Sequence, residues 1–296
     1  MKDLKKIVRS KIKNGSGRTV FWGMQFLPKA KREALYTLLA FVRHLEDVVE
    51  SPVALAEKQE ILSMWREEMD NIFERRVPAT DIGRRIYKNC MRFKLPKAEF
   101  LNLVDSISAN IDNPLKAPTL KQLSGYCRGV GGMTGRPALG GFGGGGGPPR
   151  LSLRVFGCTD EQTIRELSTS LGLAVQITNI LLNVKEDAQN GRLYIPQELL
   201  EKAGISATDP KSVVVDKNLA AARRELARIA AENYRKVYEI LEKQEKTTAR
   251  PIRLITDLYR KYFDIMEKRG WEIISPKPRV SKWCKLRILL KNLLSA

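Results

Sequence analysis

Apolar residues recur at intervals of three and four along most of this chain, which is the spacing of one buried face of an α-helix. In the clearest case, the stripe consists of Leu35, Leu38, Leu39, Val42 and Leu45. The same spacing predicts helices over residues 30–50, 57–75, 97–111, 160–188, 216–245 and 249–270. Alternation at a period of two is convincing nowhere, so strands are not expected. The pattern therefore predicts an all-α protein, an orthogonal or bundled helical domain with a central cavity.

A glycine- and proline-rich segment, residues 137–150, interrupts this helical pattern with the sequence PALGGFGGGGGPPR. Such a composition cannot sustain a helix and predicts an inserted loop. Residues 141–146 also match the pattern G-x-G-x-x-G. A dinucleotide site is not expected there, because no strand precedes the glycines.

The composition indicates an ordered chain with a strong positive charge. With 296 residues, of which 43% are hydrophobic, the chain can form one large core, and we expect a single domain over residues 1–296. The formal net charge of +19 attracts polyanions such as nucleic acids, anionic membranes or phosphorylated small molecules. We find no helix-turn-helix pattern and no interleaving of aromatic and basic residues, so nucleic acid is not an expected partner.

Other classes of chemistry find little support in the residue types. The four cysteines are far apart and form no C-x-x-C pair, so we expect reduced thiols and no zinc site. The single histidine, His44, is a poor basis for a Ser-His-Asp mechanism. No run of about 18 apolar residues predicts a membrane span. The N-terminus lacks the apolar stretch of a secretory signal, so a cytoplasmic location is expected, although a basic amphipathic targeting helix stays an alternative.

A first acidic cluster lies at the end of the helix expected over residues 30–50. Glu46 and Glu50 are one helical turn apart, Asp47 lies beside them, and Arg43 lies one turn before Glu46. Three clustered carboxylates repel one another unless cations intervene. Taken alone, such a cluster is usually a solvated helix face, so the motif needs a counterpart elsewhere in the chain.

That counterpart follows one face of the helix expected over residues 160–188. Gln176, Asn179, Asn183 and Asp187 recur at steps of three and four among Leu, Ile and Val, and Glu186 flanks them. Buried amides without partners cost about 1–3 kcal/mol each, so they indicate either an interhelical hydrogen-bond network or a set of oxygen ligands. Mg²⁺ binds oxygen ligands, often one or two carboxylates together with substrate phosphates. Two such helices facing a cavity would hold a diphosphate through bridging metal ions and exclude water from a carbocation.

With these residues in view, the chain resembles the squalene/phytoene synthase family along nearly its whole length. The segment resembling the second aspartate-rich motif of the family is the most specific. The matching segments are SGRTVFWGMQFLP (16–28), ALYTLLAFVRHLEDVVE (34–50), YCRGVGGMTG (126–135), LSLRVFG (151–157), LGLAVQITNILLNVKEDAQNGRLYIP (171–196) and RVSKWCKL (279–286). The last segment is most similar to the bacterial presqualene diphosphate synthases.

The resemblance implies an isoprenoid-synthase-type helical fold and a prenyltransferase activity. The implied reaction joins two farnesyl diphosphates head to head, with two or more Mg²⁺ ions, to give presqualene diphosphate, a precursor of squalene and hopanoids. Further reduction with NADPH, as in some relatives, is not favoured, because no nicotinamide signature is present. Two alternatives stay open: a phytoene synthase acting on two geranylgeranyl diphosphates, and a degenerate paralogue without catalysis.

The resemblance also implies roles for individual residues. Arg43, Tyr126 and Tyr194 would be catalytic, with the tyrosines near the reacting carbons or the departing diphosphate. The implied Mg²⁺ ligands are Glu46, Asp47, Glu50, Asn179, Asn183 and Asp187. The implied substrate-binding residues are Thr19, Arg43, Gln176, Asn179, Arg192 and Arg279. Gly172 would leave space for a prenyl chain.

Two departures from the family pattern bear on activity. Glu46, Glu50 and Asn183 stand where the family usually has aspartate, and Asn183 removes one negative charge from the second cluster. About 14 extra residues also separate Arg136 from Leu151, and we expect them to loop out of the surrounding helix. These departures motivate the non-catalytic alternative.

The C-terminal segment, residues 277–296, is basic and amphipathic. It carries six basic residues and no acid, and Trp283, Leu286, Leu290 and Leu293 would form an apolar stripe. Such a helix suits peripheral contact with the anionic inner face of the cytoplasmic membrane. The alternative is a solvated basic helix that packs on the domain.

Overall fold

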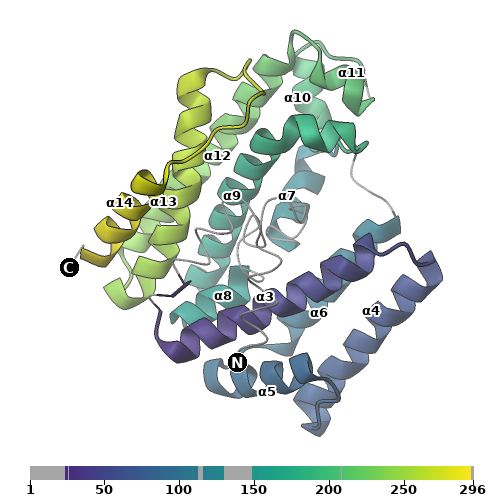
Figure 1. Ribbon diagram of the computed structural model, residues 1–296, viewed down its shortest axis with the longest axis vertical. Coiled ribbons are helices and arrows are strands. Elements are labelled where there is room, and N and C mark those ends of the chain that lie inside the picture. Colours follow the sequence, from purple (N-terminus) through teal and green to yellow (C-terminus); the bar gives the residue numbers. More distant parts are fainter. Residues whose placement is uncertain (1–23, 26, 113–115, 130–148, 208, 295–296) are drawn as a thin grey trace. The chain divides into compact units, whose positions relative to one another are not determined.

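A computed structural model describes residues 24–25, 27–112, 116–129, 149–207 and 209–294 (Figure 1). Within these ranges the regular structure is helical, apart from one isolated parallel bridge between Lys116 and Leu193. The all-α prediction is therefore confirmed. Residues 137–148 of the expected glycine-rich loop lie outside the described ranges.

The described chain forms two compact units, residues 1–113 with 129–168 and residues 114–128 with 169–296. The expectation of one domain over the whole chain stays a prediction. The helices of the first unit are α3 (Lys29–Glu50), α4 (Leu55–Asp70), the π-helical turn η1 (Asn71–Arg75), α5 (Asp81–Phe93), α6 (Lys97–Asp112), α8 (Pro149–Phe156) and the start of α9 (Glu161–Gln189). Those of the second are α7 (Leu120–Gly129), the rest of α9, α10 (Gln197–Lys202), α11 (Pro210–Val214), α12 (Leu219–Glu242), α13 (Lys246–Arg269) and α14 (Lys282–Leu294).

The core of the first unit forms around α3, which packs against α4, α5, α6 and α8. Phe41 on α3 is fully buried, and its ring lies 4.9 Å from Trp65 of α4 and 5.9 Å from Phe100 of α6, measured between ring centroids. Burial of three large aromatic side chains is a dominant contribution to the stability of a small core. The apolar stripe of the sequence thus places α3 at the centre of its unit.

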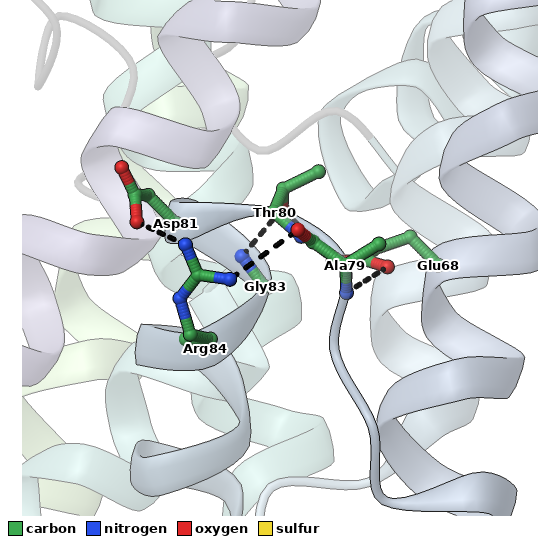
Figure 2. Close-up of polar contacts among 6 residues, drawn as sticks. All are labelled: Glu68, Ala79, Thr80, Asp81, Gly83 and Arg84. Atoms are coloured by element: carbon green, nitrogen blue, oxygen red, sulfur yellow. Dashed lines mark hydrogen bonds and ion pairs between the residues drawn. The ribbon is translucent and has the colours of Figure 1, made fainter.

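A buried carboxylate fixes the start of α5 in the same unit. Glu68 of α4 is 4% exposed and accepts hydrogen bonds from the backbone N–H of Ala79 (3.0 Å) and Thr80 (2.8 Å) and from the Thr80 hydroxyl (2.9 Å). The Thr80 hydroxyl oxygen in turn accepts from the Gly83 N–H at 2.8 Å, which is an N-cap of α5. Figure 2 shows this network, with Arg84 reaching back to Asp81 and to the Ala79 carbonyl. The Glu68 carboxylate therefore holds the start of α5 in place within the first unit.

α8 begins at Pro149, so residues 149 and 150, which were expected to belong to the inserted loop, form the start of a helix. Arg150 and Arg154 of this helix both pair with Glu161 in the first turn of α9. Lys31 of α3 donates a hydrogen bond to the Phe156 carbonyl at the end of α8, at 2.7 Å. These contacts hold the short helix between its longer neighbours.

In the second unit, α9 approaches α7 closely at Gly172. A Cβ atom at Gly172 would lie only 2.9 Å from the backbone carbonyl oxygen of Cys127 on α7. The space beside Gly172 is therefore filled by a helix backbone, whereas the resemblance implied room there for a prenyl chain. α9 is also long and apolar enough to cross a membrane by length and composition, but 89% of that stretch is buried in the protein, as in a core helix.

A buried arginine ties α12 to α9 and to the segment before α14. Arg223 is 1% exposed, and its guanidinium donates to the carbonyls of Leu181 (3.2 Å), Ile273 (3.5 Å) and Trp271. Burial lowers the pKa of this guanidinium to about 10. Because the carbonyls belong to the acidic half of α9 and to residues 271–273, Arg223 fixes the chain that leads into the C-terminal tail.

Candidate active site

Four polar side chains lie buried on one face of α9, and we call them the amide face. They are Gln176 (3% exposed), Asn179 (5%), Asn183 (4%) and Asp187 (8%). Their spacing of three and four residues puts them in line along more than two turns of the helix. The sequence prediction of an in-line polar stripe within an apolar helix agrees with this placement.

Hydrogen bonds within the amide face leave two of its buried atoms without a partner in the described ranges. The Asn179 amide donates weakly to Gln176 at 3.4 Å, and the Asn183 amide donates to the Asn179 backbone carbonyl at 2.8 Å. Among the residues that the structure describes, the Gln176 Nε2 and Asn179 Oδ1 atoms have no hydrogen-bond partner. Orphaned buried polar atoms are costly and point to a missing ligand, ion or water.

The turn after α9 places Arg192 beside the carboxylate end of the amide face. Gly191 has a positive φ of 69°, and the Arg192 N–H donates to the Asp187 carbonyl at 2.9 Å, which is a Schellman-type helix end. The next residues are held in place, because Ala117 N–H donates to the Leu193 carbonyl at 2.8 Å. Tyr194 follows and is 9% exposed.

Lys277, which lies in the segment predicted to be a basic tail, contacts this face directly. Its ammonium lies 2.5 Å from the Asn183 Oδ1 atom and 2.6 Å from the Glu186 Oε2 atom. The only sequence signal was its position two residues before Arg279, because 94 residues separate it from Asn183. The carbonyl end of a helix carries a partial negative charge, so this end of α9 favours cations.

The two predicted diphosphate-binding arginines of this unit are accessible. Arg192 is half-buried and Arg279 is exposed. Within the described part of the chain neither guanidinium has an ion pair or a side-chain hydrogen bond. Both are therefore available to an anionic ligand, for which the planar guanidinium is well suited.

The first acidic cluster is described only in part. Arg43, Glu46 and Glu50 belong to the backbone of α3, but their side chains lie outside the described residues, and Asp47 is exposed. The same holds for the Tyr126 side chain on α7, and Thr19 precedes the described chain. That the acidic side chains of α3 and α9 oppose each other, across a cavity, stays a prediction. His44 of α3 lies against Trp65 with 5.3 Å between ring centroids, which suits a packing role.

Some of the side-chain oxygens on α9 are suitable ligands for Mg²⁺, and others are already occupied. The Asp187 carboxylate and the orphaned Asn179 Oδ1 are the ligand types that Mg²⁺ prefers. The Asn183 oxygen, by contrast, already accepts a hydrogen bond from Lys277. No group of three His, Cys, Asp or Glu side chains that could hold a metal is found among the described residues. A metal ion here would need further oxygen ligands, such as those of a substrate phosphate.

Comparison with known proteins places the chain in a family. The Squalene/phytoene synthase profile matches residues 13–284. The chain is 31% identical over 275 residues to a presqualene diphosphate synthase of Sinorhizobium fredii, a match covering 93% of this chain and 92% of the relative. It is also 29% identical over 228 residues to a phytoene synthase of Arthrospira platensis, covering 76% of this chain and 70% of the relative.

Solved structures share the fold. A dehydrosqualene synthase crystallised with a ligand superposes with a TM-score of 0.77 at 22% identity, over 98% of this chain and 94% of that one. A squalene synthase of Alicyclobacillus acidocaldarius gives a TM-score of 0.74 at 20% identity, over 91% and 95%. The isoprenoid-synthase-type fold is confirmed by these likenesses. With the family profile spanning nearly the whole chain, the protein belongs to the squalene/phytoene synthase family and is an enzyme of the prenyltransferase type.

Proposed function

We propose that this enzyme joins two farnesyl diphosphates head to head to give presqualene diphosphate, in a reaction that depends on Mg²⁺. The observation that carries the proposal is the buried amide face of α9, which ends in Asp187 and leaves Asn179 Oδ1 without a partner in the described part of the chain. The relatives that match over 90% of both chains and are named presqualene diphosphate synthase support this choice of product.

The described residues would divide the work by their chemistry. Asp187 and Asn179 would hold Mg²⁺, which when bound supplies positive charge to the departing diphosphate. Arg192 and Arg279 would bind the diphosphate oxygens with their paired N–H donors. Ile180 and Val184 are buried between the polar positions of α9 in the sequence and would keep water from them. A dry surface protects an allylic cation from capture by water.

Tyr194 would contribute its hydroxyl close to these groups, at the end of the Gly191 turn. On α3, Arg43 with Glu46, Asp47 and Glu50 would complete the metal and diphosphate ligands, and Tyr126 and Thr19 would contact the substrate. Gln176 would donate its unpartnered N–H to the ligand. We expect the reaction to stop at presqualene diphosphate and not to use NADPH.

A phytoene synthase acting on two geranylgeranyl diphosphates is the second candidate, because relatives of that name match at similar identity over a smaller part of the chain. Incubation of the purified enzyme with each prenyl diphosphate and Mg²⁺, with and without NADPH, separates the candidates. We expect presqualene diphosphate from farnesyl diphosphate, and the same product when NADPH is added. Phytoene from the longer substrate would select the second candidate, and no product from either would favour a non-catalytic paralogue.

For the tail we propose docking of α14 on an anionic lipid surface at the cytoplasmic face of the membrane. Trp283 is 81% exposed, Leu286 43% and Leu290 45%, and their spacing puts them on one stripe. Exposed Lys282 flanks one side of the stripe, and Arg287 and Lys291 flank the other. The opposite face packs inward, since Leu289 is buried and Asn292 donates to Asp257 of α13 at 2.8 Å.

The partner is chosen by charge, because six basic residues and no acid follow Ile274. Each basic residue near an anionic surface contributes about 1 kcal/mol. Co-sedimentation with neutral phospholipid vesicles, with and without an anionic phospholipid, tests the proposal. We expect binding only with the anionic lipid, lost in Trp283→Gln/Leu290→Gln and kept in the control Met64→Gln, whose side chain is exposed on α4. Equal binding of the Trp283→Gln/Leu290→Gln variant and the Met64→Gln control to the anionic vesicles would contradict the docking proposal.

A further inference from the structure

The ammonium of Lys277 lies between two side-chain oxygen atoms at the end of the amide face, and we call this pair of oxygens the Lys277 cradle. Two acceptors one turn apart on α9, Asn183 Oδ1 at 2.5 Å and Glu186 Oε2 at 2.6 Å, bind it. Of its three N–H donors, these contacts use two, and Lys277 is 30% exposed. Among the described residues no other contact uses the third donor.

The backbone that leads to Lys277 is held at several points. Arg223 binds the carbonyls of Trp271 and Ile273, and Arg269 donates to the Pro276 carbonyl at 2.9 Å. An exposed ion pair between long side chains usually contributes little. Here one acceptor, Asn183, is 4% exposed, and the backbone before Lys277 is anchored by a buried guanidinium. The ammonium is therefore positioned by the fold.

The ammonium of Lys277 lies among the acidic and amide side chains at the end of α9. Glu186 and Asp187 each carry one negative charge, Asn183 is neutral, and Lys277 adds one positive charge. The orphaned Asn179 Oδ1 lies one turn before Asn183 on the same face. One cation is thus built into the protein at Asn183, and the proposed ligands of a separate ion on this face are Asn179 and Asp187.

We infer that Lys277 is a substrate-binding residue that stands in for one divalent cation at Asn183 and uses its third N–H donor to bind the diphosphate. This inference rests on the proposed function, since it assigns the Lys277 cradle to the diphosphate of that reaction. A fixed ammonium at this position lowers the number of divalent ions that the α9 side must bind with each diphosphate. It also couples the C-terminal segment to substrate binding.

Binding of inorganic pyrophosphate in the presence of Mn²⁺ tests this inference without turnover. Calorimetry gives the affinity, and electron paramagnetic resonance of free Mn²⁺ gives the number of metal ions bound per chain. Lys277→Met keeps the aliphatic stem and removes the charge, and Lys277→Gln is a second variant that keeps a polar end. Lys268→Ala, an exposed lysine at the end of α13, is the matched control.

We expect both Lys277 variants to bind pyrophosphate about tenfold or more weakly, as for loss of a hydrogen bond to a charged group. The control should match the wild type. The double variant Asn183→Asp/Lys277→Met should recover affinity and bind one more Mn²⁺ per chain. Unchanged affinity in the Lys277 variants, an equal loss in the control, or no extra Mn²⁺ in the double variant would overturn the inference. A wild type that binds pyrophosphate in this way but makes no prenyl product would contradict the proposed function alone.

Discussion

The hydroxyl groups of Tyr234 and Thr178 lie 2.8 Å apart and join α12 to α9 on the side of α9 nearly opposite the amide face. Both residues are fully buried, and Thr178 also donates to the Ala174 carbonyl at 2.7 Å. Burial raises the pKa of the Tyr234 phenol, so its proton is retained for this bond. The pair is one buried contact that restrains the rotation of α9 about its own axis and hence the direction of the amide face.

Removing this hydroxyl should weaken the second unit. We expect Tyr234→Phe to lower the free energy of unfolding by about 1 kcal/mol, because one buried hydrogen bond is lost and the ring is kept. Urea denaturation followed by circular dichroism measures the change. Tyr87→Phe is the control, since this half-buried phenol has no partner among the described residues. Equal effects of the two substitutions would argue against a fixed role for the Thr178 contact.

Arg223 should be among the most sensitive positions for stability. Arg223→Met keeps a long apolar stem but leaves the carbonyls of Leu181, Trp271 and Ile273 without their donor. We expect a loss of about 3 kcal/mol in the free energy of unfolding. The neighbouring Arg224 is exposed, so Arg224→Met provides a control with the same chemical change. A loss below about 0.5 kcal/mol at Arg223 would be the size seen at ordinary surface positions and would contradict its anchoring role.

The buried carboxylate of Glu68 gives a test in the first unit. In Glu68→Gln, one oxygen that accepts from Ala79 or Thr80 becomes an NH₂ group and faces another donor. We expect a loss of about 2 kcal/mol, measured by thermal and urea unfolding. Exposed Glu67 on the same helix supplies the control Glu67→Gln. If both variants unfold at the same urea concentration, the carboxylate does not hold the start of α5.

Thiol reactivity should separate the cysteines by burial. Burial raises the pKa of the Cys90 thiol to about 12 and that of Cys158 to about 11, and Cys127 is also buried. Because the thiolate is the reactive form, Cys284, which is only partly buried, should react first with a thiol reagent at pH 8. Mass spectrometry of the labelled peptides measures this order, and early labelling of Cys90 would contradict the packing around α5.

The same shift predicts a dependence of stability on pH. The unfolded Cys90 thiol ionises near its ordinary pKa of 9.0, whereas the folded state keeps the proton up to about 12. The free energy of unfolding should therefore fall as the pH rises through 9, by about 1 kcal/mol at pH 10 from this group. Urea titrations of wild type and Cys90→Ala at pH 8 and pH 10 isolate the effect. The variant should show a smaller fall, and an identical fall would contradict the shift.

The long helices could be predicted from the sequence because their apolar stripes are local signals. The expected boundaries of α3, α6 and α9 differ from the structure by no more than one residue at either end. α5 was not predicted, although Ile82, Ile86 and Cys90 recur at steps of four residues, because the segment is short and rich in Arg and Lys. Its start depends on Glu68, eleven residues before Ala79. Such a cap depends on the tertiary fold and leaves no periodic pattern.

The candidate site was predictable to the extent that it lies on one helix. Gln176, Asn179, Asn183 and Asp187 share the spacing of a helix face, so their alignment followed from the sequence. The contact of Lys277 with Asn183 did not, because a lysine in a run of basic residues gives no signal of its partner 94 residues away. The role of Gly172 could not be predicted either, because it depends on the close approach of the Cys127 carbonyl on another helix.

The central claim, that the amide face holds the metal and diphosphate of a prenyl transfer, is tested most directly at Asp187. The measurement is the rate of pyrophosphate release from farnesyl diphosphate over a series of Mg²⁺ concentrations, for the wild type, Asp187→Asn and the control Glu166→Gln, an exposed acid on the same helix. We predict Mg²⁺-dependent release by the wild type and the control, and a loss of at least about 100-fold in Asp187→Asn. Release by Asp187→Asn at the wild-type rate and the same Mg²⁺ concentration would contradict the account.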